Sequence, residues 1–337
     1  MRFEFYHPGL DDTPKLSVDG TVDNSLHFSH WHGNETPVEL KADTSTEIAL
    51  KLMASPRRAD FTSGIELVTN NHFDTDGVLS VWTVLNGERA LELRDRLIPA
   101  AEAGDFSEIN SEAGVKASIV IQGSDQPVPG ESSISPLASH IAGTNVEDEA
   151  SSYELVLPEV EGVLTKTNEY EHLWSEPWKK LETALDSFAR GASTVNEFRD
   201  ANLSLVNLAP GVFGPTGFDP ALHSAPATAI SQHAHGRLFL ITTPYQRGWS
   251  YRIDYPYYSW AETVVRPRIP RHDFSDLLLR LNQAEGHTEN RWKSDSSELA
   301  SAIKFVSSDT RLAASRLPPD DVANLIRQEL AAEASGS

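Results

Sequence analysis

A short acidic loop between two apolar runs, at residues 65–86, is the feature that most limits the folds open to this chain. The run 65-IELVTNN-71 has the length and apolar content of a buried strand, and 77-GVLSVWTVLN-86 has those of a helix that ends near Gly87. A strand, a loop and a helix in this order open an α/β unit. Ligands of such units gather at the carboxyl ends of parallel strands, so the loop HFDTDG stands where a binding site is expected.

Three side chains that can bind metals stand two residues apart in this loop: His72, Asp74 and Asp76. In an extended segment, residues two apart point to the same side. Two carboxylates and an imidazole on one side repel and desolvate one another unless a cation neutralises them. We expect Gly77 to let the backbone turn tightly into the helix. In the structural alternative, Asp76 caps the helix, Asp74 faces solvent, and His72 has no role.

The chain has no cysteine, which excludes disulfides, thiolate metal sites and cysteine nucleophiles. A bound metal must therefore be held by His, Asp or Glu, ligands that favour Mn, Mg or Zn.

The pattern of an apolar strand, His-x-Asp-x-Asp-Gly-Val-x-Ser and an apolar helix, at residues 65–86, resembles the first motif of the Asp-His-His (DHH) phosphoesterase superfamily. The resemblance implies a pair of divalent metals, usually manganese, that activate water for attack on a phosphoester. It also implies Asp74 and Asp76, with His72, as metal ligands. The Asp-His-His triplet and the glycine-rich GGGH motif of that superfamily are absent here. The wider sequence, including 256-PYYSWAE-262 and 270–286, is similar to an uncharacterised bacterial family.

Two metals need more ligands than this loop supplies. Further candidates are Asp105, His140, and either His30 or His32 at the end of a predicted strand. Each also has an ordinary structural explanation, as a loop residue, a buried histidine or a surface histidine. His140 and His30 are in addition the candidate acid–base residues.

Residues 237–273 are rich in arginine and aromatic side chains, against the trend of an acidic chain. Arginine pairs with phosphate and aromatic rings stack on bases, so this segment is a candidate substrate wall. The candidate substrate-binding residues are Arg237, Arg252, Arg268 and His235. Alternatively, these arginines belong to a sheet and pair with the acidic first domain.

The length of 337 residues suits two domains. We expect an α/β domain over 1–192, with a mainly parallel sheet flanked by helices, and a smaller α+β domain over 193–337. Strands are expected at 18–32, 202–209 and 237–244, with an alternating stretch at 249–260. Helices are expected at 43–54, 88–104, 169–192, 274–286 and 318–337, the last of them frayed at its end. Residues 122–152 are expected to form a loop or an active-site flap.

A formal net charge of -21 argues against binding to long nucleic acids, although a small phosphorylated substrate remains compatible with it. The sequence has no membrane-length apolar run and no secretory signal pattern, so we expect a cytoplasmic protein. The combined hypothesis is a divalent-metal-dependent hydrolase, with manganese favoured, that acts on a small phosphorylated substrate, for which a nucleotide is one candidate. The alternatives are a non-catalytic binding protein with a degenerate site, and a hydrolase of another bond. The oligomeric state does not follow from the sequence.

Overall fold

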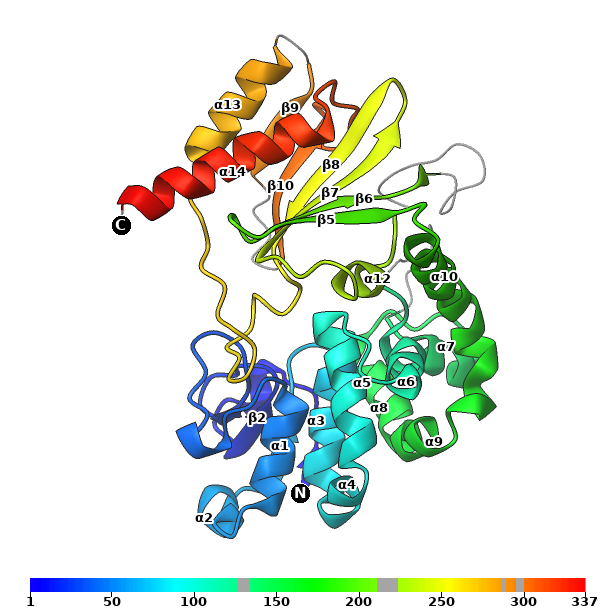
Figure 1. Ribbon diagram of the computed structural model, residues 1–337. Coiled ribbons are helices and arrows are strands. Elements are labelled where there is room, and N and C mark those ends of the chain that lie inside the picture. The colour runs from blue at the N-terminus through cyan, green and yellow to red at the C-terminus, as the bar shows by residue number, and fades with distance from the viewer. Residues whose placement is uncertain (126–133, 211–223, 287–288, 295–299, 337) are drawn as a thin grey trace. The chain divides into compact units, whose positions relative to one another are not determined.

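The computed structural model describes residues 1–125, 134–210, 224–286, 289–294 and 300–336. The chain forms two compact units (Figure 1). The first unit comprises Met1–Trp178 and Trp260–Arg268, and the second comprises Lys179–Ser259 and Ile269–Ser337. The expected boundary at residues 192/193 therefore lies elsewhere: the chain divides at Trp178, within one helix, and a later segment returns to the first unit.

The first unit is built on a sheet of four parallel strands in the order β1-β4-β2-β3. The strands are β1 (Arg2–Phe3), β2 (Lys15–Val18), β3 (Leu26–Phe28) and β4 (Leu67–Thr69). Every residue of β2 and β4 is buried, as is usual for the inner strands of a parallel sheet. The expected parallel sheet is confirmed, but the strand expected over 18–32 is shorter and begins only at Leu26.

Helices cluster beside this sheet, and α1, α3 and α5 lie next to one another (Figure 1). The first six helices of the unit are α1 (Ser45–Ala54), α2 (Arg58–Thr62), α3 (Thr75–Asn86), α4 (Glu88–Glu92), α5 (Arg94–Phe106) and α6 (Glu112–Gln122). The side chain of Thr44 accepts a hydrogen bond from the backbone N–H of Glu47 and so caps α1, which lies within the helix expected over 43–54.

The stretch 122–152, expected to be a loop, contains helical structure where it is described. These helices are α7 (Pro136–Ala142) and the start of α8 (Glu149–Val156), whereas residues 126–133 lie outside the described part of the chain. Both helices have side-chain caps, Ser135 and Asp148, that accept backbone N–H groups of the first turn. Ser135 and Asp148, polar residues of the stretch expected to be a loop, therefore mark helix starts. Beyond them follow α9 (Val160–Thr165) and α10 (Glu171–Ala189), which crosses the unit boundary.

The second unit is a six-stranded mixed sheet in the order β5-β6-β7-β8-β10-β9, with the helices α13 and α14 over one face (Figure 1). Its strands are β5 (Thr194–Phe198), β6 (Leu203–Asn207), β7 (Leu238–Tyr245), β8 (Gly248–Asp254), β9 (Arg291–Ser294) and β10 (Ser301–Val306). Its helices after α10 are α12 (Ala227–Ser231), α13 (Ser275–Glu285) and α14 (Pro319–Gly336). Tyr251, Ile253 and Ile303 belong to its core, which α13 and α14 complete with Leu277 and Val322.

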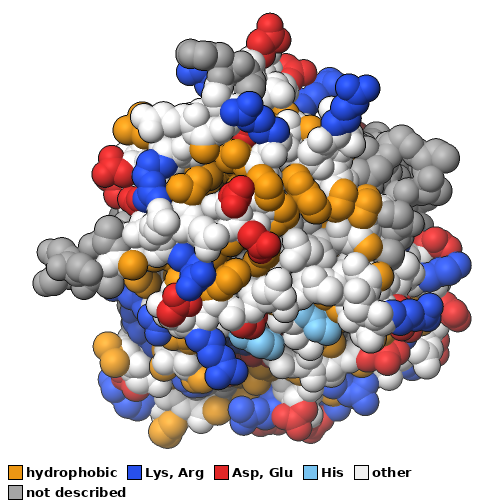
Figure 2. Space-filling model, turned by 45° about the horizontal axis from the view of Figure 1, so that its top comes forward, with side chains coloured by type: hydrophobic (Ala, Val, Ile, Leu, Met, Phe, Trp, Pro, Cys, Tyr) orange, Lys and Arg blue, Asp and Glu red, His pale blue; other side chains and the backbone are white. Residues whose placement is uncertain are grey.

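Charged side chains of both signs are mixed on the molecular face shown in Figure 2, with apolar side chains between them. The acidic excess of the sequence is therefore not gathered into a single patch on that face. Among the described helices, none has the length and apolar content needed to cross a bilayer.

Helix α5 continues past Gly104, where the sequence suggested an end, and stops at Phe106 with Ser107 in a left-handed conformation. Gly104 is needed inside the helix because a β-carbon there would lie 2.7 Å from Cβ of Thr75 in α3. The glycine thus marks a close helix–helix approach, which carries the next residue, Asp105, towards α3.

We predict that Gly104→Ala destabilises the protein by about 1–3 kcal/mol, because the added methyl forces α5 away from α3. Helix propensity alone predicts the opposite sign, a gain of about 0.5–1 kcal/mol. Chemical denaturation measures the free energy of unfolding, with Ala103→Gly as a control that weakens the same helix without adding an atom. A stabilised Gly104→Ala protein would contradict the proposed contact.

Candidate metal centre

The parallel strands of the first unit deliver three polar side chains to one edge of the sheet. Asp19 directly follows β2, His30 stands two residues beyond β3, and His72 stands three residues beyond β4. Because β4, β2 and β3 are neighbours and run parallel, their carboxyl ends meet at this edge. The sheet topology therefore gathers residues that lie more than fifty positions apart in the sequence.

One group of possible metal ligands is fully enclosed: Asp19, His30, Asp76 and Asp105. Nε2 of His30 lies 3.3 Å from Oδ1 of Asp19, 3.7 Å from Oδ2 of Asp76 and 3.1 Å from Oδ2 of Asp105. The side chains of His30 and Asp19 are 0% exposed and that of Asp105 is 3% exposed. These four side chains thus form a polar cluster that solvent scarcely reaches.

A second group shares Asp19 with the first and adds His72 and Asp74. Nε2 of His72 lies 2.8 Å from Oδ2 of Asp19 and 3.2 Å from Oδ2 of Asp74. This group is more open, because the side chains of His72 and Asp74 are 23% and 27% exposed. Asp19 presents one carboxylate oxygen to each histidine, so it joins the two groups.

The two aspartates of the loop have structural partners as well as positions in the cluster. Asp74, and not Asp76, is the N-cap of α3, because its Oδ1 accepts from the backbone N–H of Gly77 at 2.7 Å. Asp76 lies buried in the first turn, where its two oxygens accept from the backbone N–H groups of Ser45 and Thr46 at 2.7 and 2.8 Å. Its negative charge thus meets the N-terminus of α1, a favourable place for an anion.

Hydrogen bonds at Nδ1 orient both histidines towards the carboxylates. Nδ1 of His30 lies 2.6 Å from the carbonyl oxygen of Asp43, and Nδ1 of His72 lies 3.1 Å from Oδ1 of Asn71. A carbonyl oxygen can only accept, so each Nδ1 is the donor and the neutral ring keeps its lone pair on Nε2. In metal sites the same arrangement fixes the tautomer and the orientation of the ligating ring.

Two glycines in the segments that carry the candidate ligands pack closely against polar side chains. A β-carbon on Gly20 would lie 2.6 Å from Oδ1 of Asn70, and one on Gly77 would lie 2.7 Å from the hydroxyl of Tyr153. Gly77 is therefore required by lack of space, and not by the tight turn predicted from the sequence. Asp19 itself has a positive φ of 64°, which is uncommon for a residue with a side chain.

Crowding changes the protonation of the cluster. Burial, followed by repulsion from Asp19, raises the pKa of Asp76 to about 7. Burial and the charges of Asp74 and Asp76 raise the pKa of Asp105 well above its usual value. Although burial opposes it, the carboxylates of Asp74 and Asp19 raise the pKa of His72 to about 12. Without a cation, the cluster therefore retains protons near neutral pH.

The donor set fits divalent cations. Several of its candidate ligand atoms are buried and contact only one another, with no hydrogen-bond partner outside the cluster, although buried polar groups are nearly always satisfied in native proteins. They are both carboxylate oxygens of Asp19, Nε2 of His30, Nε2 of His72 and Oδ2 of Asp105. The two groups together contain four carboxylates and two imidazoles, so two divalent cations would balance their full negative charge. Oxygen and imidazole nitrogen are ligands that Mn and Zn accept.

The structure brings together five of the residues proposed from the sequence: His30, His72, Asp74, Asp76 and Asp105. It adds Asp19, which sequence reasoning missed. The pattern that could have found it is a second apolar run followed by Asp-Gly, at 15-KLSVDG-20, like the one at 74–77.

The other candidate histidines of the first unit lie outside both groups. His140 is exposed on α7, where its ring lies 4.4 Å from that of His172. His32 is also exposed, and its Nδ1 lies 3.6 Å from a carboxylate oxygen of Glu262.

The proposed substrate-binding residues are divided between the units. Arg237, Arg252 and His235 belong to the second unit, and Arg268 is the exposed last residue of the segment that returns to the first. Arg252 lies on β8 and pairs with Asp254, whereas Arg237 and His235 are exposed before β7. Their role in substrate binding remains a prediction.

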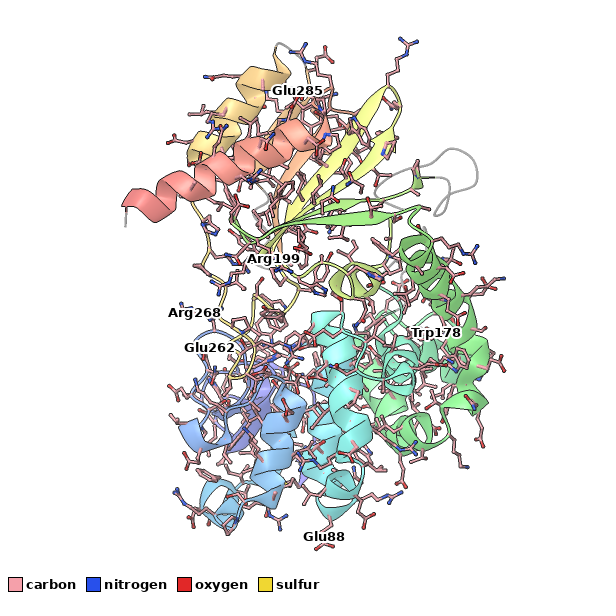
Figure 3. All side chains as sticks on the ribbon, viewed as in Figure 1. Glu88, Trp178, Arg199, Glu262, Arg268 and Glu285 are labelled. Carbon is pink, nitrogen blue, oxygen red and sulfur yellow. The ribbon has the colours of Figure 1, made fainter. Side chains whose placement is uncertain are left out.

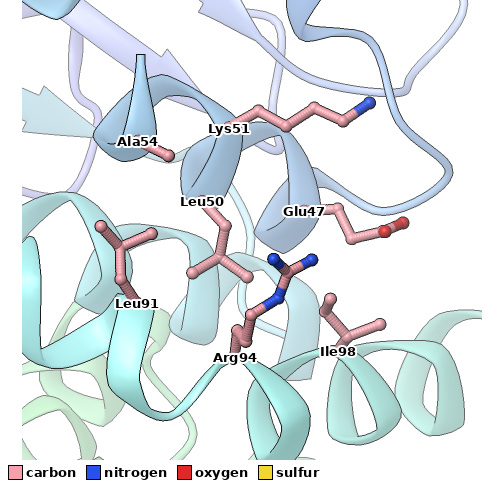
Figure 4. A pocket seen from close by; sticks show the side chains of 7 residues that line it. All are labelled: Glu47, Leu50, Lys51, Ala54, Leu91, Arg94 and Ile98. Atoms are coloured by element: carbon pink, nitrogen blue, oxygen red, sulfur yellow. The ribbon is translucent and has the colours of Figure 1, made fainter. Parts of the chain in front are cut away.

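A shallow pocket between α1, α4 and α5 shares no residue with the acidic cluster (Figure 4). It is lined by Glu47, Leu50, Lys51, Ala54, Leu91, Arg94 and Ile98. Its lining combines four apolar side chains with Glu47, Lys51 and Arg94. With a single carboxylate and no histidine, it offers far fewer metal-binding groups than the acidic cluster.

Comparison with solved structures finds a similar chain described as the pGpG-specific phosphodiesterase PggH from Vibrio cholerae. The match has a TM-score of 0.38 and 9% sequence identity, and it covers 95% of this chain and 99% of that chain. A likeness of this size gives no ground for transferring that protein's activity. No curated protein matches the sequence.

A family model does match, over nearly the whole chain, at residues 2–335. The protein belongs to the family of unknown function DUF6687.

Proposed function

We propose that the protein is a divalent-metal-dependent hydrolase of phosphoesters, with manganese as the favoured metal and a small phosphorylated substrate. The observation that carries the proposal is Asp19, a buried carboxylate that presents one oxygen to each of two histidine–carboxylate groups. A carboxylate shared in this way is suited to bridging two cations. The loop motif His72–Ser80, which resembles that of the DHH superfamily, supports the same reaction class.

The residues around the proposed cations have separable tasks. His30, Asp76 and Asp105 would hold one cation in the enclosed group, and His72 and Asp74 would hold the other in the open group, with Asp19 common to both. This placement makes His30 a ligand and not an acid–base residue, because Nδ1 is engaged by Asp43 and Nε2 faces three carboxylates. When bound, divalent cations lower the pKa of water to near neutrality and polarise a phosphoryl oxygen.

The open group is the side from which a substrate would enter. His72 and Asp74 are partly exposed, whereas the other ligands are enclosed. The half-buried indole of Trp31 lies beside them, with its ring centroid 5.1 Å from that of His72. An aromatic ring next to a phosphate-binding metal offers a stacking surface for a base, which favours a nucleotide-like substrate.

The substitution Asp105→Asn tests whether Asp105 is a metal ligand or a structural residue, because the two roles predict opposite changes in the melting temperature of the metal-free protein. Without metal, we expect Asp105→Asn to keep or raise the melting temperature, because the raised pKa of Asp105 means that its charged form is destabilised at this position, and Asn has the same shape without the charge. The wild type should gain about 2.7 kcal/mol when free Mn²⁺ is 100-fold above its dissociation constant, and the variant should lose most of this gain. Differential scanning calorimetry with and without Mn²⁺ measures both quantities. A variant that melts lower without metal but is stabilised normally by Mn²⁺ would refute the assignment.

Manganese affinity should rise with pH. The raised pKa of Asp76, about 7, means that the metal-free cluster carries protons below neutrality that a cation must displace. The apparent dissociation constant should therefore fall between about pH 6 and about pH 8, with release of protons. Titration calorimetry in buffers of different ionisation enthalpy measures both the affinity and the protons released. An affinity independent of pH in this range would contradict a site made of these carboxylates.

Activity should depend on manganese and on the cluster. We expect phosphate release from a nucleotide or a nitrophenyl phosphate ester to fall at least about 100-fold in Asp19→Asn and in Asp74→Asn. Asn at position 74 can still cap α3, so its loss of activity would report the lost charge and not a lost cap. Asp12→Asn, at an exposed position of the same unit, is the matched control. A wild type that binds two Mn²⁺ but releases no phosphate from a substrate panel would favour a binding protein instead.

A further inference from the structure

The segment Trp260–Arg268 is contributed to the first unit by the second half of the chain. The chain leaves the second unit after Ser259 and re-enters it at Ile269. Figure 3 labels Glu262 and Arg268 on this looped segment. The segment contacts residues of the acidic cluster and their immediate supports, although it supplies no ligand itself.

The carboxylate of Asp43 anchors the segment through hydrogen bonds. This buried group accepts hydrogen bonds from the backbone N–H groups of Val264, Val265 and Arg266, the last two at 2.7 and 3.0 Å. It also accepts from Nη1 of Arg266 at 2.8 Å. A carboxylate enclosed by several N–H groups is an anion-binding nest, which fixes the backbone of the donating residues.

The same Asp43 holds His30. Its carbonyl oxygen accepts from Nδ1 of His30 at 2.6 Å, and the backbone N–H of Glu262 donates to the carbonyl oxygen of His30 at 2.7 Å. The indole of Trp260 lies edge-on to the imidazole, with the ring centroids 5.0 Å apart. His30 is thus fixed through its ring, its backbone and the packing of its face.

Arg266 fixes the end of α5, where Asp105 lies, by contacting three residues near Asp105 in the sequence. Its guanidinium pairs with Glu102 at 2.7 Å and with Glu108 at 2.6 Å, carboxylates that stand on either side of Asp105 in the sequence. It also lies over the ring of Phe106, 4.7 Å from the centroid. With a side chain only 15% exposed, Arg266 joins Asp43, before α1, to the end of α5.

We propose that Trp260–Arg268 is a clasp that sets the metal affinity of the enclosed group, with Trp260 and Arg266 as positioning residues and Asp43 as its anchor. The inference rests on the proposed function in one respect, that cations bind the cluster. The clasp fixes His30 and Asp105 without touching a cation, as outer residues of metal sites do. Cation binding and the docking of Trp260–Arg268 are then thermodynamically linked. A bound cation stabilises the docked clasp, and the docked clasp raises the affinity for the cation.

The full chain with the substitutions Trp260→Leu and Arg266→Met tests the proposal by titration calorimetry with Mn²⁺. We expect each to weaken one of two Mn²⁺ sites by about 10–100-fold, and the other much less. Trp260→Phe, which keeps an aromatic edge, should restore much of the affinity. Arg58→Met is the matched control, because it removes the same charge from an exposed position of the same unit, on α2. Equal weakening of both sites, or wild-type affinity in both variants while they remain folded, would overturn the clasp.

Hydrogen exchange of the wild type provides a second measurement that needs no variant. Saturating Mn²⁺ should slow exchange of the amides of residues 264–266, which donate to Asp43, and leave the amides of β7 unchanged. No change at residues 264–266 despite bound Mn²⁺ would refute the coupling, even if the variants failed to fold. A wild type that binds no Mn²⁺ would instead refute the proposed function, so the two failures are distinguishable.

Discussion

Four carboxylates occupy one small volume of the first unit, with two histidines between them, and solvent scarcely reaches three of the four. Mutual repulsion and burial raise the pKa of Asp76 and of Asp105, so in the absence of a cation the protein must keep protons there. Evolution towards stability alone would remove such a cluster, because crowded buried charges are costly unless they are compensated. Under the proposed function, bound cations would offset the stability that this arrangement costs.

The surrounding fold offsets part of this cost. Asp76 receives two backbone N–H groups from the start of α1, and Asp74 caps α3 with one oxygen while the other faces His72. Helix N-termini are favourable places for negative charge, so two of the four carboxylates are stabilised before any cation arrives. Asp19 is compensated differently: although burial raises its pKa, the charge of His72 and the hydrogen bonds from His30 and His72 lower it below the usual value. The carboxylate that the two groups share is thus held as an anion by two imidazoles.

The return of Trp260–Arg268 to the first unit brings a segment from the second half of the sequence into contact with this site. Arg266 forms ion pairs with Asp43, Glu102 and Glu108. Its guanidinium charge offsets the repulsion among these three carboxylates. The arginine-rich segment was predicted to face a substrate, or to pair with acidic residues of the first domain. For Arg266 the structure gives the second outcome, within the first unit, and the ion pairs support the residues that carry ligands.

Local sequence determined a large part of this protein. The strand–loop–helix at 65–86, the capped α1, the strands β6 and β7 and the helices α10 and α13 follow from periodicity and capping, which act over a few residues. His72, Asp74 and Asp76 could be named as candidate ligands from their spacing, but only His72 and Asp74 fall in one group, because Asp76 lies in the first turn of α3 and joins the enclosed group. Gly104 was misread as a helix end, because its reason lies in Thr75 of another helix.

Tertiary structure decided what these residues do together. Asp19 and His30 meet His72 only because β2, β3 and β4 are neighbouring parallel strands, a pairing that no local pattern specifies. Asp105 reaches the cluster only because α5 packs closely on α3, and His30 is fixed by a segment more than two hundred residues away. The sequence by itself determined the ligand-bearing loop, because short-range geometry suffices for it. The complete centre needed the fold, because its remaining members are joined by long-range packing alone.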